Sequence, residues 1–255
     1  HEILGLGDLR SGLDAAGQQV MNPVCFVLMA ERLVTIRHHA PRPFETYPPR
    51  AEKSSLGCSS PDRIFLSLVE EVIGRLADHL ETAGRGLDAV SRSIYRAGPK
   101  APGQEELQRA LYNLGEEGER VSRVRLSLLT LGRAQNYVDQ ILGHRLSGEG
   151  LGLVLKGQLK DIEALEVHAD FLSSRLGLMS DATMGTINLA QNTTVRIVSV
   201  VAVLFMPPTL IASVYGMNFA RMPELAQPWG YPMALGLMVA SAIATWAVFR
   251  WRGWL

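Results

Sequence analysis

The stretch SVYGMNFARMPEL, residues 213–225, lies between two long apolar segments near the end of the chain and decides how the rest is interpreted. Residues 197–220 contain no charged side chain, and residues 225–249 contain none either. Each segment reaches the roughly 20 residues that a helix needs to cross the hydrocarbon core of a bilayer. The sequence therefore predicts two membrane spans, joined by a short turn that is the only part of the chain to face outside.

The composition outside these spans excludes several classes of function. The 25 basic and 25 acidic residues cancel, and no basic stripe with interleaved aromatics indicates a nucleic-acid partner. Cys25 and Cys58 match no metal-ligand or redox spacing. The stretch GLGLVLKG at residues 150–157 lacks the spacing of a phosphate-binding loop, and the six histidines form no catalytic arrangement. We predict that the protein is not an enzyme and has no catalytic cofactor.

Residues 1–150 are predicted to form a mostly helical α+β domain. A short apolar run at residues 24–29, a turn, and an alternating segment at residues 33–37 are typical of a β-hairpin. Ser60 precedes a proline and a helical repeat of apolar residues, which is a typical helix start. A second helix is expected over residues 104–142, after the glycine- and proline-rich stretch 97–103. The chain begins with His1, so we expect the natural N-terminus to lie further upstream.

A single long helix is predicted from about Leu151 to Tyr215, because no strong stop occurs before the Pro207-Pro208 pair. At 1.5 Å per residue it would be roughly 100 Å long, so we expect a cytosolic stalk at residues 151–196 and a first span at residues 197–217. An external loop is then predicted at residues 218–228, a second span at 229–249, and a cytosolic tail at 250–255.

A stripe of mostly small or polar residues follows this helix in steps of four and three. It consists of Asp181, Gly185, Asn188, Asn192, Val195, Ser199, Ala202, Met206, Thr209, Ser213 and Gly216. A sustained 3.5-residue repeat favours helices that supercoil about a common axis, where several copies would leave a narrow, partly polar tube. Close packing of membrane helices through small residues explains the same stripe, so both interpretations stay open on sequence alone.

The charges that flank the spans predict the orientation. Arg196 precedes the first span, and Arg250 and Arg252 follow the second, while the outer turn carries one base and one acid. The excess of positive charge on cytosolic flanks places both termini in the cytosol. Aromatic residues that suit the membrane interface lie near the ends of the second span, at Trp229, Tyr231, Trp246, Trp251 and Trp254.

The terminal third of the chain resembles the CorA family of magnesium channels. The signature of that family is Gly-Met-Asn at the outer end of the first span, present here at Gly216, Met217 and Asn218. The Met-Pro-Glu-Leu turn at residues 222–225 and the sequence NLAQN at residues 188–192 also resemble it. The resemblance implies a homopentamer in a bacterial-type inner membrane, with an N-terminal cytoplasmic α/β funnel domain, a long pore helix and two terminal spans. It also implies transport of Mg²⁺, with Co²⁺ and Ni²⁺ as further candidates.

The resemblance assigns roles to individual residues. Gly216, Met217 and Asn218 would form the selectivity filter, in which five Asn218 amide oxygens accept hydrogen bonds from the water shell of a hydrated ion. Gly216 is expected to let the helix end in an unusual backbone conformation. Thr209, Met206 and Asn192 match pore positions of the family. Asp181 lies on the same stripe and would concentrate cations inside the stalk, and Glu224 would do so outside, although a solvated loop acid explains Glu224 equally well. The remaining residues that we expect to line the pore are Val195, Val198, Ser199, Ala202 and Ser213.

In this family, Mg²⁺ bound between cytoplasmic domains holds the channel closed. The carboxylates Asp161, Glu163, Glu166 and Asp170 are candidates for such a regulatory site, because the last three share one helical face. A solvated charged face explains them equally well.

Two alternatives remain at this stage. A related zinc transporter branch, ZntB-like, is proposed to move Zn²⁺ with protons, although the full Gly-Met-Asn motif favours the magnesium interpretation. A membrane-anchored coiled-coil scaffold would conduct nothing, and it would have no need of Asn192, Ser199 and Thr209 along one line.

Overall fold

A computed structural model describes residues 2–8, 22–38, 41–95, 103–148, 150–217, 223 and 227–253. The chain divides into two compact units, His1–Met184 and Gly185–Leu255. The division falls inside one helix, so neither unit coincides with a domain predicted from sequence. The predicted limits of the membrane spans stay predictions.

The first unit contains a three-stranded antiparallel sheet in the order β1 (Glu2–Asp8), β2 (Asn22–Leu28) and β3 (Leu33–Arg37). Val24 pairs with Arg37, and Leu28 pairs with Leu33, which confirms the predicted hairpin. Strand β1 was not predicted. Gly5 and Gly7 weaken its intrinsic strand preference, and pairing with β2 supplies the missing stabilisation.

Two short helices, α1 (Pro43–Thr46) and the 3₁₀ helix η1 (Pro48–Lys53), connect the sheet to α2 (Pro61–Tyr95). The Ser60 hydroxyl accepts a hydrogen bond from the Arg63 backbone N–H at 3.4 Å, so the predicted helix start is confirmed. The sheet packs on α2 through Phe26, whose ring lies edge-on to Phe65 with centroids 5.5 Å apart.

Helix α3 (Gln104–Gly148) begins where predicted but extends beyond residue 142, the predicted end. The Gly103 N–H donates to the Glu106 carboxylate, which caps the first turn. Tertiary contacts support the extra turns, since Leu146 is buried and Arg145 forms an ion pair with Asp62 on α2.

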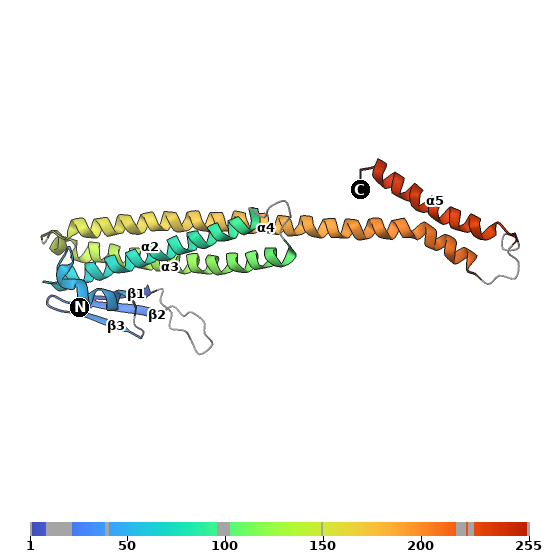
Figure 1. The fold of residues 1–255 in the computed structure, drawn as a ribbon. Coiled ribbons are helices and arrows are strands. Elements are labelled where there is room, and N and C mark those ends of the chain that lie inside the picture. The colour runs from blue at the N-terminus through green and yellow to red at the C-terminus, as the bar shows by residue number, and fades with distance from the viewer. Residues whose placement is uncertain are drawn as a thin grey trace. The chain divides into compact units, whose positions relative to one another are not determined.

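Helix α4 (Gly152–Tyr215) confirms the single long helix predicted from sequence. Its residues up to Met184 belong to the first unit, where they pack beside α2 and α3 (Figure 1). The side chains that α4 buries there recur mainly at intervals of seven or three, at Leu155, Ile162, Ala169, Leu172 and Met179. This interval keeps one face of α4 against its neighbours.

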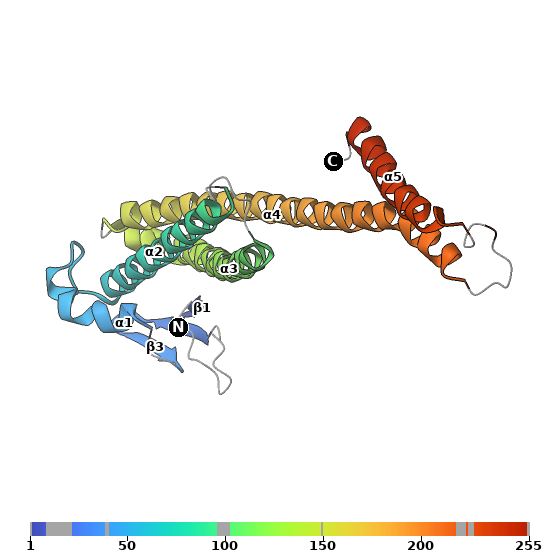
Figure 2. The same cartoon turned by 45° about the vertical axis from the view of Figure 1, so that its right-hand side comes forward.

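The second unit contains residues 185–215 of α4 and helix α5 (Gly230–Trp251). Both helices are long and apolar enough to span a membrane, as predicted. Helix α5 has 22 residues and is about 33 Å long at 1.5 Å per residue, which fits the hydrocarbon thickness. Figure 2 shows α5 running back from the end of α4.

Candidate ion pathway

The predicted pore residues lie on one face of α4 within the second unit. Seven residues advance an ideal helix by 20° less than two full turns, so a stripe with this repeat drifts by only about 60° between Asn192 and Ser213. Every described member of the stripe from Asp181 onward is exposed in the single chain. The structure thus brings the predicted residues onto a common surface, and the described part of the chain does not cover that surface.

Exposure extends well beyond the stripe. No residue in the apolar window of α4 is buried, and Leu210, which lies off the stripe, is 65% exposed. Met206, on the stripe, is equally exposed at 65%. Exposed apolar surface of this extent needs a covering, which in a membrane is lipid or another protein helix.

The Thr209 hydroxyl is positioned as a hydrogen-bond acceptor on the stripe. Its hydroxyl donates to the Phe205 carbonyl oxygen at 2.7 Å, so its only proton is already committed to the backbone. The lone pairs that remain on the oxygen can accept hydrogen bonds. An acceptor at this position suits the water shell of a cation, because water bound to a cation presents its hydrogens outward.

An apolar section precedes Thr209 in the chain. Val195, Val198 and Met206 are exposed by 64%, 62% and 65%, respectively. Ser199 and Ala202, which lie between them in sequence, are also exposed. An apolar section of this kind forms a gate when it excludes water from a narrow channel.

The first residue of the predicted filter differs from expectation in one respect. The φ angle of Gly216 is not in the left-handed region, so the predicted unusual backbone conformation is wrong. Its N–H donates to the Ala212 carbonyl at 2.9 Å and continues the helical pattern. Glycine is favoured here by space instead, because a Cβ atom would lie 3.0 Å from that carbonyl oxygen.

The other filter residues are only partly described. Met217 is 48% exposed, and its N–H donates to the Val214 carbonyl at 3.3 Å. Asn218, the predicted ligand of the hydrated ion, and Glu224 lie outside the described residues. Their roles stay predictions.

Two consecutive prolines interrupt the hydrogen bonding of α4 beside the stripe. Pro207 and Pro208 have no N–H, so the carbonyls of Val203 and Leu204 lose their usual partners four residues on. The helix nevertheless continues to Tyr215, and Figure 1 shows it bending near this level. The helix predicted from sequence passes through this pair to Tyr215, as observed, and the prolines account for the bend.

The four carboxylates proposed for regulation lie on the part of α4 that belongs to the first unit. Asp161, Glu163 and Asp170 are exposed, and Glu166 is half-buried. Asp170 forms an ion pair with Arg125 of α3, with a guanidinium nitrogen 3.0 Å from a carboxylate oxygen. The sequence did not reveal this partner. Among the described residues, no group of three or more acidic, histidine or cysteine side chains is placed to hold a metal ion. A site built from these carboxylates therefore needs ligands from another source, such as a second copy.

Comparison with known proteins extends over most of the chain. The sequence profile described as "CorA-like Mg2+ transporter protein" matches residues 10–251. The magnesium transport protein CorA of Pasteurella multocida is 38% identical over 232 residues, which cover 91% of this chain and 71% of that protein. The magnesium transport protein CorA of Escherichia coli is 35% identical over 242 residues, covering 95% and 74%.

Solved structures agree in fold. The CorA magnesium transporter of Methanocaldococcus jannaschii matches with a TM-score of 0.75 at 15% identity, covering 100% of this chain and 78% of that chain. The ZntB cytoplasmic domain of Vibrio parahaemolyticus matches with a TM-score of 0.57 at 11% identity, covering 73% and 69%. The likeness to the first therefore includes the membrane helices, whereas that to the second leaves about a quarter of the chain unmatched.

Proposed function

Because this chain belongs to the CorA-like Mg²⁺ transporter family, we propose that it forms a channel through which Mg²⁺ enters the cell, driven by the membrane potential. The observation that carries the proposal is the exposed stripe on α4, which runs from Asn192 to Gly216. Its lining is polar at Thr209 and Ser213, ahead of the Gly-Met-Asn motif of the family.

A hydrated ion suits this set of residues. Mg²⁺ prefers six oxygen ligands in octahedral geometry and releases its water reluctantly. The pathway offers neutral acceptors, namely the amide of Asn218 and the hydroxyl of Thr209, rather than a cage of carboxylates. Such acceptors bind the outer face of the water shell weakly enough for the ion to leave, as conduction requires.

The membrane potential supplies the driving force. A divalent cation that moves inward gains roughly 4.6 kcal/mol per 100 mV of inside-negative potential, which is twice the value for one charge. No nucleotide hydrolysis is needed for entry. The channel conducts Mg²⁺, with Co²⁺ and Ni²⁺ as further candidates.

Assembly as a homopentamer in the inner membrane would make the stripe the lining of a pore and would cover its exposed residues. Several copies of α4 around one axis turn the exposed stripe into the lining of a pore, while lipid covers the remaining apolar faces. Arg196, Arg250 and Arg252 favour an orientation with both termini in the cytosol.

Intracellular Mg²⁺ closes the channel by binding between copies in the first unit. Carboxylates on α4 support this part of the proposal. The exposed Glu163 and the half-buried Glu166 are the leading candidates of the face they share with Asp170, because Asp170 already contacts Arg125. Asp181 lies on the stripe itself and attracts cations to the inner end of the pathway.

The experiment that tests the proposal is a flux measurement in liposomes. The purified chain is reconstituted with a trapped Mg²⁺ indicator, and an inside-negative potential is imposed. Entry that is abolished by Asn218→Ala, while the variant keeps the native oligomeric mass, supports a channel with Asn218 in its filter. Entry that is unchanged in the variant contradicts the role of Asn218, and a protein that moves no ion at all is a scaffold.

A parallel arm separates the zinc alternative. Zn²⁺ replaces Mg²⁺ outside, and a trapped pH dye reports proton movement. If no Mg²⁺ enters but Zn²⁺ enters with a change in lumenal pH, this chain has the zinc activity despite its intact Gly-Met-Asn motif. The proposal expects Mg²⁺ entry with no accompanying pH change.

A further inference from the structure

A second candidate site lies in the first unit, where the structure has an open cavity of about 540 Å³ between α1, η1 and α2. Small-molecule sites commonly have volumes of about 300–1,000 Å³, so the cavity has the size for a metabolite rather than a single ion. None of its lining residues belongs to the proposed ion pathway. Its wall includes Arg42, Arg50 and Arg75.

Two of these arginines have unused hydrogen-bonding capacity. Arg50 is neutralised by Glu71, since the two charged groups approach to 2.5 Å. In the described part of the chain, no carboxylate forms an ion pair with Arg42. Arg75 contacts Asp78 through one terminal nitrogen at 3.4 Å, and its buried Nε has no partner among the described residues.

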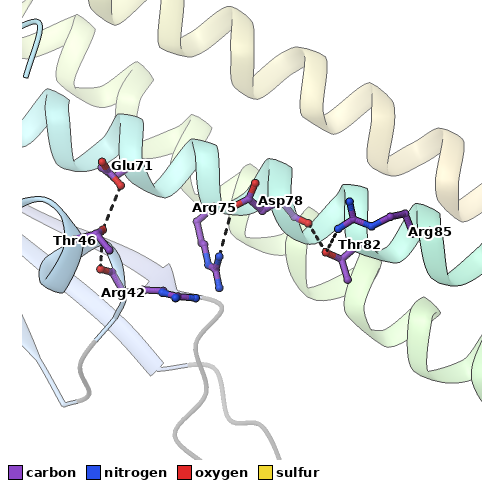
Figure 3. Close-up of polar contacts among 7 residues, drawn as sticks. All are labelled: Arg42, Thr46, Glu71, Arg75, Asp78, Thr82 and Arg85. Carbon is purple, nitrogen blue, oxygen red and sulfur yellow. Dashed lines mark hydrogen bonds and ion pairs between the residues drawn. The ribbon is translucent and has the colours of Figure 1, made fainter.

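The two arginine side chains point toward one another. Figure 3 shows the guanidinium groups of Arg42 and Arg75 converging from α1's start and from α2, beside the Thr46–Glu71 hydrogen bond. Two like charges that converge repel each other, and an anion between them converts the repulsion into two charge-assisted hydrogen bonds. The arrangement is therefore suited to an oxyanion.

Two residues of the same wall have buried hydroxyl groups. Tyr47 and Ser67 are 5% and 4% exposed, and both line the cavity. Neither hydroxyl has a hydrogen-bond partner within the part of the chain that the structure describes. Buried polar groups of this kind are uncommon because an unmade hydrogen bond is costly. Both oxygens are almost inaccessible to solvent, so the proposed ligand contacts neither of them.

We propose that this cavity binds a phosphate monoester of nucleotide size, with the phosphate between Arg42 and Arg75. The carboxylates of Glu70 and Asp78 also line the cavity. They disfavour further phosphate groups by charge repulsion, and they can accept hydrogen bonds from sugar hydroxyls, as acidic residues do in dinucleotide sites.

Calorimetric titration of the full chain in detergent tests this proposal, with adenosine monophosphate, inorganic phosphate, sulfate and adenosine as probes at constant ionic strength. The monophosphate should bind saturably at one site per chain, phosphate should compete with it, and adenosine should not bind detectably. Arg42→Gln should weaken monophosphate binding at least tenfold, because a charge-assisted hydrogen bond is lost.

Arg85→Gln is the matched control. Arg85 lies on α2, is paired with Glu81 at 2.7 Å and does not line the cavity, so its loss should leave binding unchanged. Unfolding temperatures are measured for every variant, so that a loss of binding is separated from a loss of folding. The proposal is overturned if the monophosphate does not saturate, or if Arg42→Gln binds it as well as the native chain. Equal binding of sulfate and the monophosphate would overturn the assigned ligand class.

Discussion

Most described leucines of the first unit are buried, whereas no described leucine of the second unit is, although one helix contributes to both units. Leu172 of α4 is 1% exposed, whereas Leu210 of the same helix is 65% exposed. Up to Met184, α2 and α3 cover one face of α4, and beyond it the described residues provide no comparable covering. Apolar content alone therefore does not define a core. A leucine is buried where neighbouring helices of the chain pack on it, and it is left for lipid or another copy to cover where they do not.

The largest expected effect tests the first half of this comparison. Leu128→Ala on α3 should lower the free energy of unfolding by about 2–5 kcal/mol, because it opens a cavity in a fully buried site. The measurement is denaturant unfolding of the full chain in detergent, followed by circular dichroism.

Leu126→Ala provides the matched control. Leu126 lies on the same helix but is 54% exposed, and its loss should cost less than about 1 kcal/mol. Equal losses at the two positions would show that partner copies bury Leu126 as thoroughly as this chain buries Leu128.

The next largest effect is expected from the ion pair between Arg145 and Asp62 in the first unit. Arg145→Met removes the partner of Asp62, whose side chain is only 5% exposed, and should cost about 1–3 kcal/mol in unfolding free energy. Arg85→Met breaks a pair whose side chains are both mostly exposed, so it should cost less than about 1 kcal/mol. A smaller loss for Arg145→Met than for Arg85→Met would contradict the assigned burial.

The second unit is tested by transport rather than by stability. Ala202→Leu enlarges a residue on the stripe, and we expect Mg²⁺ flux in liposomes to fall about tenfold or more because every copy narrows the pore. Ala247→Leu makes the same change at an exposed position of α5 and should leave flux unchanged. If both variants conduct normally, α4 does not line the pathway through Ala202.

The smallest effect concerns Glu117 on α3. Burial raises the pKa of this carboxyl above its usual value, and Arg120, 3.6 Å away, opposes the shift. An acid whose pKa is raised by folding stabilises the fold below its unfolded pKa, and this contribution is lost as the pH rises through the folded pKa. Glu117→Gln should therefore raise the unfolding temperature by a few degrees at most at pH 7, and the gain should disappear at pH 4. A gain that is constant with pH would contradict this origin.

Local signals in the sequence predicted most of the helical architecture. The Ser60 cap, the hairpin that ends at Arg37 and the uninterrupted run into Tyr215 each depend on residues close together in the chain, and each is confirmed. Strand β1 and the last turns of α3 were not predicted, because long-range contacts stabilise both.

The candidate sites differ in the same way. The stripe was predictable because its residues recur at a regular interval within one helix. The Gly-Met-Asn motif of the family begins at its last residue, Gly216. The cavity was not, because Arg42 and Arg75 belong to different elements and meet only after packing. The role of Asn218 in the filter stays a prediction, and the flux experiment decides it.

The paired prolines of α4 have a mechanical consequence. A helix resists bending through its ladder of hydrogen bonds, and Pro207 and Pro208 remove two adjacent rungs of that ladder. The stiffness of α4 is therefore lowest one residue from Met206 and one from Thr209. When a force acts on α4 from the first unit, the bending concentrates at this flexible point instead of spreading along the helix. In the proposed channel, the side chains of Met206 and Thr209 would then move together, so a small tilt would change the width and the wetting of the pore in a single motion.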